Sequence, residues 1–286
     1  MMLKKHKILL QQKNKISKKV LWGITMFDYE MFKDQILKLT TIDLNAYKER
    51  QMKRRIDALI SKHGFSGYEE FVKAIKVDKD LFETFVAYLT INVSEFYRNP
   101  GQWKILEDEV LPLLMKQNQG QPLKIWSAAC STGDEPYSLV MLLTKFFPLR
   151  QIKVIATDID KQILAKAKLG LYDEKSLQGL PQEFKDKYFT KVGQRSYTIS
   201  GEIKSCVEFR EHNLLRDTYI SGCDLIVCRN VMIYFTEEAK IEIYKRFNQA
   251  LKKDGVLFVG STEQIIQAQS LNFKALQSFF YQKIDS

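Results

Sequence analysis

Residues 125–136 constrain the fold of this chain more than any other segment. They read Ile-Trp-Ser-Ala-Ala-Cys-Ser-Thr-Gly-Asp-Glu-Pro: an apolar run typical of a buried strand, a loop of small residues, and a helix start. A second apolar run, residues 152–157, follows after a helix-length interval and ends in Asp158. A strand, a small-residue loop, a helix and an acid at the end of the next strand are typical of the ligand-binding edge of a doubly wound α/β sheet.

The loop differs from the glycine-rich loop that binds dinucleotides. Ala128, Ala129 and Ser131 stand where that loop has glycines. Asp134 and Glu135 place negative charge at the helix start, where a pyrophosphate would otherwise bind. The pattern therefore predicts a ligand with a cation and a ribose. S-adenosylmethionine, which has a sulfonium, an ammonium group and a free ribose diol, meets both demands.

The acids and the turn of this edge have separable expected roles. Asp158 is predicted to accept both ribose hydroxyls, while Asp160 suits the N-cap of the following helix. Gly133 is expected to adopt a positive φ, and Pro136 fits the first helical position. Asp134 and Glu135 are open to two readings, because acids at a helix start also complement the helix dipole.

Two further segments are candidates for the same site. Residues 224–235 read as a buried strand that runs into Arg229 and Asn230 and then into an apolar segment containing Tyr234. Polar residues after a central strand lie where such sheets bind ligands, although Tyr234 is equally compatible with core packing. Residues 92–98, Asn-Val-Ser-Glu-Phe-Tyr-Arg, fit either a lid over the pocket or a structural turn.

From residue 123 onward, predicted strands alternate with predicted helices, which indicates a mostly parallel sheet covered on both faces. Residues 171–206 break the alternation with helical stretches and two short strand-like runs around Gly193, and they are predicted to form a small inserted β-subdomain. The predicted strands are residues 123–128, 152–157, 207–210, 223–228 and 256–260, with a final antiparallel pair at 273–275 and 279–283; the predicted helices are 136–147, 161–168 and 237–251.

Upstream of this catalytic domain, assigned to residues 117–286, apolar residues recur at helical spacing and predict a small all-helical domain over residues 26–116. In the helix around residues 47–62, Arg50, Lys53 and Arg54 lie roughly opposite an apolar stripe, in a locally basic stretch. A solvated face and a docking face both explain these cations. The predicted helices are residues 27–39, 44–62, 67–76, 80–90 and 100–116, and the stripe consists of Met52, Ile56, Leu59 and Ile60.

Composition excludes several classes of protein. Seven lysines and no acid fall within residues 1–25, which we expect to be a poorly ordered basic extension, so the net charge of +10 is weak evidence for nucleic-acid binding. No apolar run reaches the roughly 18 residues of a membrane span, and no secretory signal pattern is present. The four cysteines have no metal-ligand or disulfide spacing, so buried thiols and no metal site are expected. We therefore expect a cytoplasmic monomer that neither binds nucleic acid nor inserts into a membrane.

Five segments of the sequence together closely resemble the chemotaxis receptor methyltransferases of the CheR family. The resemblance covers about residues 27–284 and implies the S-adenosylmethionine-dependent methyltransferase type of α/β fold, with a helical N-terminal domain. Ser94 and Tyr97 depart mildly from the family pattern, where a threonine and a phenylalanine are usual. The resemblance rests on residues 92–98, 126–138, 156–160, 213–215 and 228–235.

The resemblance implies an activity and a set of roles. The activity is methyl transfer from S-adenosylmethionine to glutamate side chains on the cytoplasmic helices of chemoreceptors, leaving S-adenosylhomocysteine. Arg98 and Tyr234 would lie beside the acceptor and the transferred methyl group. Glu135 would hold the cationic amino-acid part of the cofactor and Asp158 its ribose. The other residues implied to line the cofactor pocket are Asn92, Ser94, Asn213, Leu214, Arg229 and Asn230.

The resemblance also bears on how the receptor is recognised. The helical domain of this family docks on acidic receptor helices, which favours Arg50, Lys53 and Arg54 as a docking face. Some members grip a receptor's C-terminal pentapeptide with a longer, glycine-richer turn than residues 192–195 provide. We therefore expect this chain to act without a pentapeptide tether.

Three other functions compete with this interpretation. A nucleic-acid methyltransferase of the amino type usually carries Asn/Asp-Pro-Pro-Tyr after the fourth strand, and residues 228–234 contain no proline. A binding module that kept the fold without activity is disfavoured by the complete set of motifs. A nicotinamide dehydrogenase is the least compatible, because the glycine loop is absent.

Overall fold

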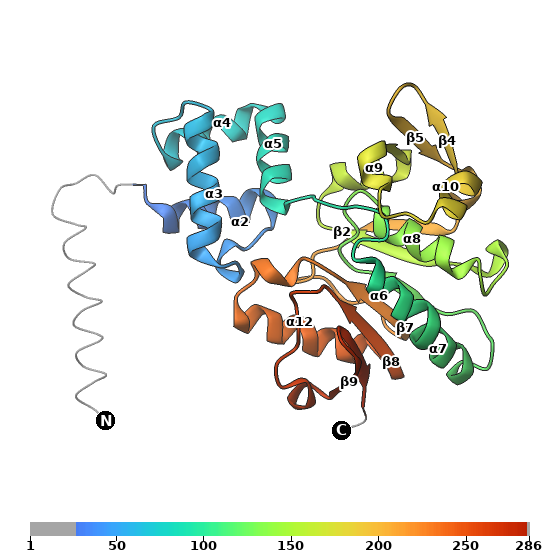
Figure 1. Cartoon of the computed structure of the whole chain (residues 1–286). Coiled ribbons are helices and arrows are strands. Elements are labelled where there is room, and N and C mark those ends of the chain that lie inside the picture. The colour runs from blue at the N-terminus through green and yellow to red at the C-terminus, as the bar shows by residue number, and fades with distance from the viewer. Residues whose placement is uncertain (1–26, 285–286) are drawn as a thin grey trace, which may run out of the picture. The chain divides into compact units, whose positions relative to one another are not determined.

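The computed structural model describes residues 27–284, so the predicted basic extension at residues 1–25 lies outside the described part. The described chain divides into two compact units (Figure 1). Residues 27–45 and Lys53–Phe82 form the helical unit, and Ala46–Met52 with residues 83–284 form the catalytic unit.

The helical unit is built from amphipathic helices. α2 (Tyr29–Thr40) begins where the Asp28 carboxylate accepts a hydrogen bond from the Met31 amide at 3.0 Å. Its apolar face contacts α4 (Tyr68–Val77), where the rings of Phe32 and Tyr68 lie 4.9 Å apart. α5 (Lys79–Thr90) and α3 (Glu49–Lys62) run across the boundary between the two units.

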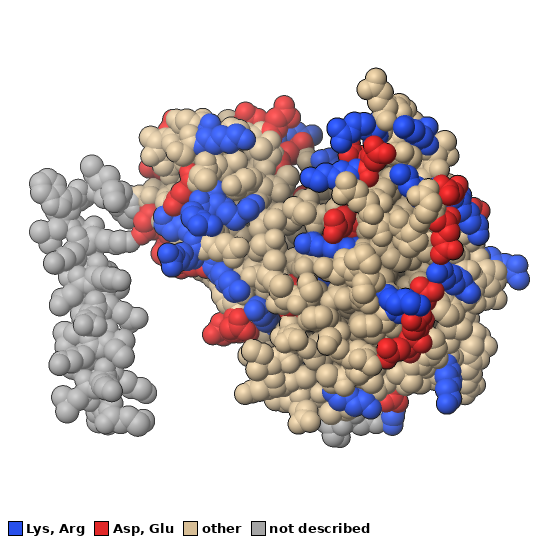
Figure 2. Space-filling model, viewed as in Figure 1, with Lys and Arg blue, Asp and Glu red and all other residues tan. Residues whose placement is uncertain are grey.

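Helix α3 has the predicted apolar stripe, and the predicted basic residues lie on the same helix. Arg50 and Arg54 are exposed, and the Lys53 ammonium forms an ion pair with Asp57 at 2.9 Å. Figure 2 shows lysine and arginine side chains gathered over this helix. The predicted apolar residues are all buried: Met52, Ile56, Leu59 and Ile60.

A seven-stranded sheet in the order β6-β2-β1-β7-β8-β10-β9 forms the centre of the catalytic unit. The first five are parallel, and β10 pairs antiparallel with both β8 and β9, so the final pair is antiparallel as the sequence predicted. The mostly parallel doubly wound sheet is thereby confirmed. The strands are β1 (Ile125–Ser127), β2 (Val154–Asp158), β6 (Val207–Glu211), β7 (Cys223–Cys228), β8 (Leu251–Val259), β9 (Phe273–Gln277) and β10 (Phe280–Lys283).

Strand alternation sends neighbouring side chains to opposite faces of this sheet, and helices bury both faces. Trp126 and Ile226 belong to one apolar cluster, with Phe247 of α12 (Glu237–Ala250). Ile125 and Val227 belong to the other, which includes apolar residues of α8 (Asp134–Leu143). α9 (Lys161–Leu169) follows β2 and packs against β2 and β6.

The predicted boundary between residues 116 and 117 differs from the division of the structure, in which the catalytic unit already includes residues 83–116. Trp103 and Leu111 are buried in the same cluster as Ile125 of β1. Helical periodicity predicts an apolar face here but does not say which domain covers it. The predicted helix at 100–116 consists of α6 (Pro100–Ile105), a π-helical turn (Leu106–Val110) and α7 (Leu111–Gln117).

The segment 171–206 forms a small antiparallel sheet in the order β3-β5-β4. β4 (Phe189–Val192) and β5 (Ser196–Ile199) are the two predicted runs, joined by a turn at Gly193 with a φ of 80°. β3 (Leu171–Asp173) was not predicted, because three residues are too few for a recognisable alternation. Two helices, α10 (Gln182–Tyr188) and α11 (Gly201–Ser205), complete the segment.

The start of α8 differs by two residues from the prediction. The helix begins at Asp134, so Pro136 is its third residue rather than its first. The position is still tolerated, because the amides of the first turn have no partner within the helix. Gly133 has the predicted positive φ, at 90°.

The described residues 27–284 contain no helix long and apolar enough to cross a membrane. Within the same range no group of histidine, cysteine and acidic side chains is arranged to hold a metal ion. All four cysteines are buried and unpaired.

Candidate functional site

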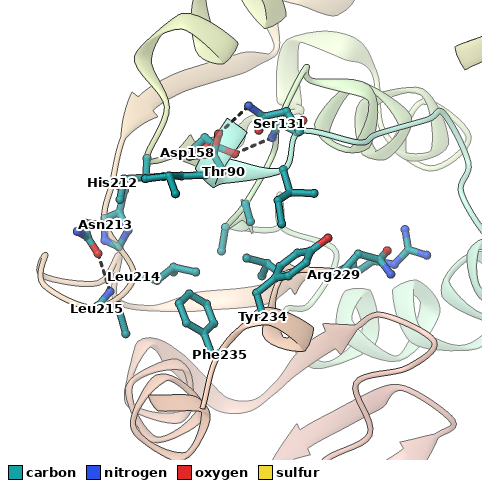
Figure 3. Close-up of a pocket in the computed structure, with 18 of the residues that line it drawn as sticks. Thr90, Ser131, Asp158, His212, Asn213, Leu214, Leu215, Arg229, Tyr234 and Phe235 are labelled. Carbon is teal, nitrogen blue, oxygen red and sulfur yellow. Dashed lines mark hydrogen bonds between the residues drawn. The ribbon is translucent and has the colours of Figure 1, made fainter. Parts of the chain in front are cut away.

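A pocket of the catalytic unit lies at the carboxyl ends of β1, β2, β6 and β7, and residues after each of these strands line it (Figure 3). Its wall also includes residues 89–93, which end α5 and continue beyond it, and Tyr47, which precedes α3. Of the predicted residues, the pocket brings together Asn92, Asp158, Asn213, Leu214, Arg229, Asn230 and Tyr234.

Asp158 ends β2 and is held rigidly by backbone amides. One carboxylate oxygen accepts the Ser131 amide at 2.8 Å and the other accepts the Asp160 amide at 3.1 Å. Burial raises the pKa of Asp158 to about 6, although these hydrogen bonds oppose the shift. Each oxygen has a second lone pair, so this carboxylate fits a ligand that donates two hydrogen bonds, as a ribose diol does.

Asp160 has two functions. Its Oδ1 accepts the amides of Gln162 and Ile163 and caps α9, as predicted. Its Oδ2 accepts hydrogen bonds from the Thr90 hydroxyl at 3.1 Å and the Asn92 side-chain amide at 2.9 Å. Asp160 therefore fixes the segment that follows α5 against the edge of the sheet.

That segment has an unusual backbone. Ile91 has a φ of 50°, which is uncommon for a β-branched residue, and the Val93 amide donates to the Ile91 carbonyl at 3.0 Å. The tight turn places Asn92 in the pocket wall and leaves the Val93 side chain 70% exposed.

The wall after β6 is held by its own polar contacts. The Asn213 side chain accepts the Leu215 amide at 2.9 Å, and Asp217 accepts the Asn213 amide at 2.8 Å. The Arg246 guanidinium on α12 donates to the Leu214 carbonyl at 2.7 Å. These bonds fix the backbone of the loop around Leu214, whose side chain lines the pocket.

Arg229 lines the pocket as expected, but its guanidinium also makes contacts within the protein that the sequence did not predict. Its guanidinium donates to the Arg98 carbonyl at 2.7 Å and to Gln102 Oε1 at 2.6 Å, and it lies 3.7 Å from the Glu135 carboxylate. In Figure 3 the guanidinium points away from the cavity. Burial lowers the pKa of Arg229, and the nearby Glu135 carboxylate opposes that shift. Arg229 thus ties residues 98–102 to the end of β7.

Two predicted acids lie at the start of α8, outside the pocket wall. The Ser127 hydroxyl donates to Glu135 Oε1 at 2.8 Å, and burial raises the pKa of Glu135 while Arg229 lowers it. Burial also raises the pKa of Asp134 to about 6. Neither residue lines the pocket, and the same holds for the predicted residues Ser94 and Arg98.

Arg98 lies close to that buried ion pair. Its guanidinium donates to the Val93 carbonyl at 3.3 Å, and its charge acts on the pKa of both Glu135 and Arg229. The nearby Ser94 hydroxyl opposes the rise in the pKa of Asp134 that burial causes.

Tyr234 lies in a short 3-10 turn (Met232–Tyr234) and lines the pocket beside Phe235 (Figure 3). The Lys48 amide donates to the Tyr234 carbonyl at 2.9 Å, and the rings of Tyr47 and Phe235 lie 4.8 Å apart. The chain just before α3 is therefore attached to the loop that carries Tyr234.

Sequence reasoning missed several residues of the wall. Tyr47 and Thr90 are far from the strand motifs in sequence, and only tertiary contacts bring them to the pocket. His212 could have been found, because it lies two residues beyond the predicted strand 207–210 and directly after β6 of the structure, on the side where ligands bind. Burial lowers the pKa of His212 and favours the neutral imidazole.

Comparison with known proteins assigns a family to this geometry. Residues 92–280 match the CheR methyltransferase, SAM binding domain, and residues 28–90 match the CheR methyltransferase, all-alpha domain. A chemotaxis protein methyltransferase of Listeria monocytogenes is 41% identical over 90% of this chain and 97% of its own length. Chemotaxis protein methyltransferase 1 of Pseudomonas aeruginosa is 38% identical over 83% of this chain and 90% of its own.

Among solved structures, a TehB-like SAM-dependent methyltransferase from Corynebacterium glutamicum covers 65% of this chain and 94% of its own, at 15% identity and a TM-score of 0.36. That score is too low to add to the assignment, which rests on the sequence matches. The cofactor of the matched domain is S-adenosylmethionine, as the loop at residues 128–135 predicted. The chain belongs to the CheR methyltransferase family.

Proposed function

We propose that this chain transfers a methyl group from S-adenosylmethionine to glutamate side chains on the cytoplasmic helices of chemoreceptors, and that it does so in the cytoplasm. The observation that carries the proposal is Asp158, a buried carboxylate fixed by two backbone amides at the wall of the pocket. A carboxylate with free lone pairs in this position suits the ribose diol of the cofactor.

The remaining cofactor contacts are proposed from the same pocket. Asn213 and Leu214 flank the adenine, because their loop is fixed and Leu214 offers an apolar surface. Asn92 and Asn230 add polar contacts, and Glu135, with Ser94 and Arg229 nearby, provides negative charge for the cationic end. Glu135 lies outside the pocket wall, 3.7 Å from Arg229, so direct contact with the cofactor would require a different rotamer of its side chain.

When bound, S-adenosylmethionine supplies a methyl group on a good leaving group. The acceptor glutamate is ionised at neutral pH and needs no general base. The protein's task is then to align the acceptor and exclude water, effects worth about 7–11 kcal/mol when the geometry is near ideal. We assign the orientation of the acceptor carboxylate to Arg98 and Tyr234.

Substitution of Arg98 tests this assignment. Arg98→Ala is expected to lower kcat by about a hundredfold, because a charge-assisted contact to the acceptor is removed. Affinity for S-adenosylhomocysteine, measured by calorimetry, is expected to change much less. Turnover within twofold of wild type would contradict the assignment of Arg98.

The receptor would be recognised through helix α3. Arg50, Lys53 and Arg54 of α3 form the proposed docking face, which is complementary in charge to acidic helices. The turn between β4 and β5 is short, with Val192 paired to Ser196. We therefore propose that no pentapeptide tether is needed. Calorimetry with receptor tail peptides should give no measurable heat of binding, and micromolar binding would refute this part.

The reaction itself is tested with radiolabelled S-adenosylmethionine and receptor cytoplasmic fragments. We expect label in the receptor that is released by mild alkali, as for a carboxyl methyl ester. Alkali-stable label would indicate methylation of nitrogen, and unlabelled receptor with active S-adenosylmethionine would contradict the proposed substrate.

A further inference from the structure

One buried carboxylate near the pocket has no part in the function described so far. Glu263 follows β8 and is only 5% exposed, although it does not line the pocket. A buried carboxylate is costly unless hydrogen bonds satisfy it, so its partners indicate its purpose.

Those partners are backbone amides of the loop after β7. Glu263 Oε2 accepts the Asn230 amide at 2.7 Å, and Oε1 accepts the Ile233 amide at 3.3 Å. The Gly260 amide also donates to Oε2, at 2.8 Å. Together the bonds span the turn that leads from Asn230 to Tyr234, both of which line the pocket.

The turn needs such support because its backbone is strained. Asn230 has a φ of 61°, in the left-handed region that non-glycine residues seldom adopt. Burial raises the pKa of Glu263, and the amides of Asn230, Gly260, Ile233 and Met232 lower it, so they favour the ionised form. An ionised acceptor makes stronger bonds to amides than a neutral one does.

Glu263 is itself held firmly. Its amide donates a hydrogen bond to the Gly260 carbonyl at 3.0 Å and so closes a turn. Two residues later the Ile265 amide donates to the Tyr281 hydroxyl of β10 at 3.0 Å. A Cβ at position 260 would lie 2.6 Å from Glu263 Oε2 and 2.8 Å from the Asn230 nitrogen. Only glycine therefore allows the loops after β7 and β8 to approach so closely.

We propose that Glu263 is a positioning residue for methyl transfer, which fixes Asn230 and Tyr234 by binding the backbone of the loop that carries them. The inference rests on the proposed roles of these two residues. It places the support of the catalytic loop in the segment after β8, which has no contact with the pocket.

Glu263→Gln tests this inference, with Asp224→Asn as the matched control. Asp224 is a buried carboxylate at the opposite end of β7, where it accepts the Lys124 amide and the Lys252 ammonium, each at 2.7 Å. Each substitution neutralises a buried acid: Asp224 lies within β7, and Glu263 binds the loop that follows β7. Only the loss at position 263 should disturb the loop that carries Tyr234.

The first readout is independent of the methyl acceptor. In hydrogen exchange followed by mass spectrometry, the peptide covering residues 229–235 should exchange at least tenfold faster in Glu263→Gln and at the wild-type rate in Asp224→Asn. Unchanged exchange of this peptide in a folded Glu263→Gln protein would overturn the inference.

The second readout is turnover per folded molecule. We expect Glu263→Gln to lower kcat at least tenfold, with a change of no more than a few-fold in affinity for S-adenosylhomocysteine. A kcat within twofold of wild type would overturn the positioning role. If wild type itself fails to methylate receptor fragments, the proposed substrate is wrong, while the exchange experiment still decides the role of Glu263.

If Glu263→Gln does not fold, Gly260→Ala tests the same contact from the other side. The added methyl group would displace the Glu263 carboxylate or the Asn230 amide. The same rise in exchange of residues 229–235 supports the inference, and wild-type exchange refutes it.

Discussion

At the scale of single residues, the proposed binding of the cofactor depends on a carboxylate, Asp158, whose pKa is raised by burial. Asp158 has a pKa raised to about 6, and the proposed contact with a ribose diol requires its ionised form. Protonation would replace an acceptor by a donor and remove part of the contact. The affinity for the cofactor should therefore depend on pH in a range where most carboxylates do not titrate.

The sign of this dependence follows from linkage. Binding favours ionised Asp158 and lowers its pKa, so the full affinity is present above about pH 6 and is lost as the pH falls through 6. The dissociation constant of S-adenosylhomocysteine should rise up to about tenfold between pH 6 and pH 5. In Asp158→Asn the affinity should be weaker at pH 8, and this rise should be largely absent. An equally steep rise in the variant would assign the titration to another group.

Asp160 offers a second prediction at this scale, because one carboxylate caps α9 and holds Thr90 and Asn92. Asp160→Ala should cost about 0.5–2 kcal/mol of stability from the lost cap and also weaken S-adenosylhomocysteine binding. Asp28→Ala, which removes the cap of α2, is the control. It should destabilise the protein in urea without changing affinity, and equal affinities of the two variants would contradict the double role.

Single residues also mark the limit of sequence analysis. Asp158 could be placed in the pocket because it lies at the end of a recognisable strand, and Asn213 because the family resemblance implied it. The hydrogen bonds from the Arg229 guanidinium to residues 98–102 could not be predicted from the sequence, because these partners lie about 130 positions away. Glu263 gave no signal, because a single acid in a loop has no periodicity.

At the scale of elements, α3 carries the proposed docking face. The double charge reversal Arg50→Glu with Arg54→Glu should raise KM for receptor fragments by about tenfold or more, since like charges would then face acidic helices. The cost should shrink at high salt, which screens exposed charges. Affinity for S-adenosylhomocysteine should stay at its wild-type value.

The matched control for α3 lies on α4. Lys73→Glu with Lys76→Glu changes the net charge equally at exposed positions of another helix. A rise in KM of the same size in this control would show that overall charge, rather than the α3 face, governs docking.

Helices and strands were predicted correctly where their apolar pattern extends over enough residues to be recognised. The stripe of α3 and the five parallel strands correspond to the sequence pattern. β3 was missed because it has only three residues, and the start of α8 was displaced because a proline is tolerated throughout the first turn. Periodicity fixes the type of an element better than its ends.

At the scale of the whole molecule, the division into units follows burial rather than helical content. Residues 100–117 are helical, like the N-terminal unit, but their apolar face is buried in the same cluster as β1 and β7. The sequence predicted a helical domain and a mostly parallel doubly wound sheet, and the structure contains both. The helices at residues 100–117 belong to the catalytic unit because of packing against residues far away in the sequence, which a local pattern does not reveal.

The central claim is that the pocket at the carboxyl ends of β1, β2, β6 and β7 holds the cofactor through Asp158. A crystal structure of the protein with S-adenosylhomocysteine tests it most directly. Both ribose hydroxyls should lie within hydrogen-bond distance of the Asp158 carboxylate, and the adenine should lie beside Leu214. An empty pocket, or a nucleoside bound elsewhere on the protein, would contradict it.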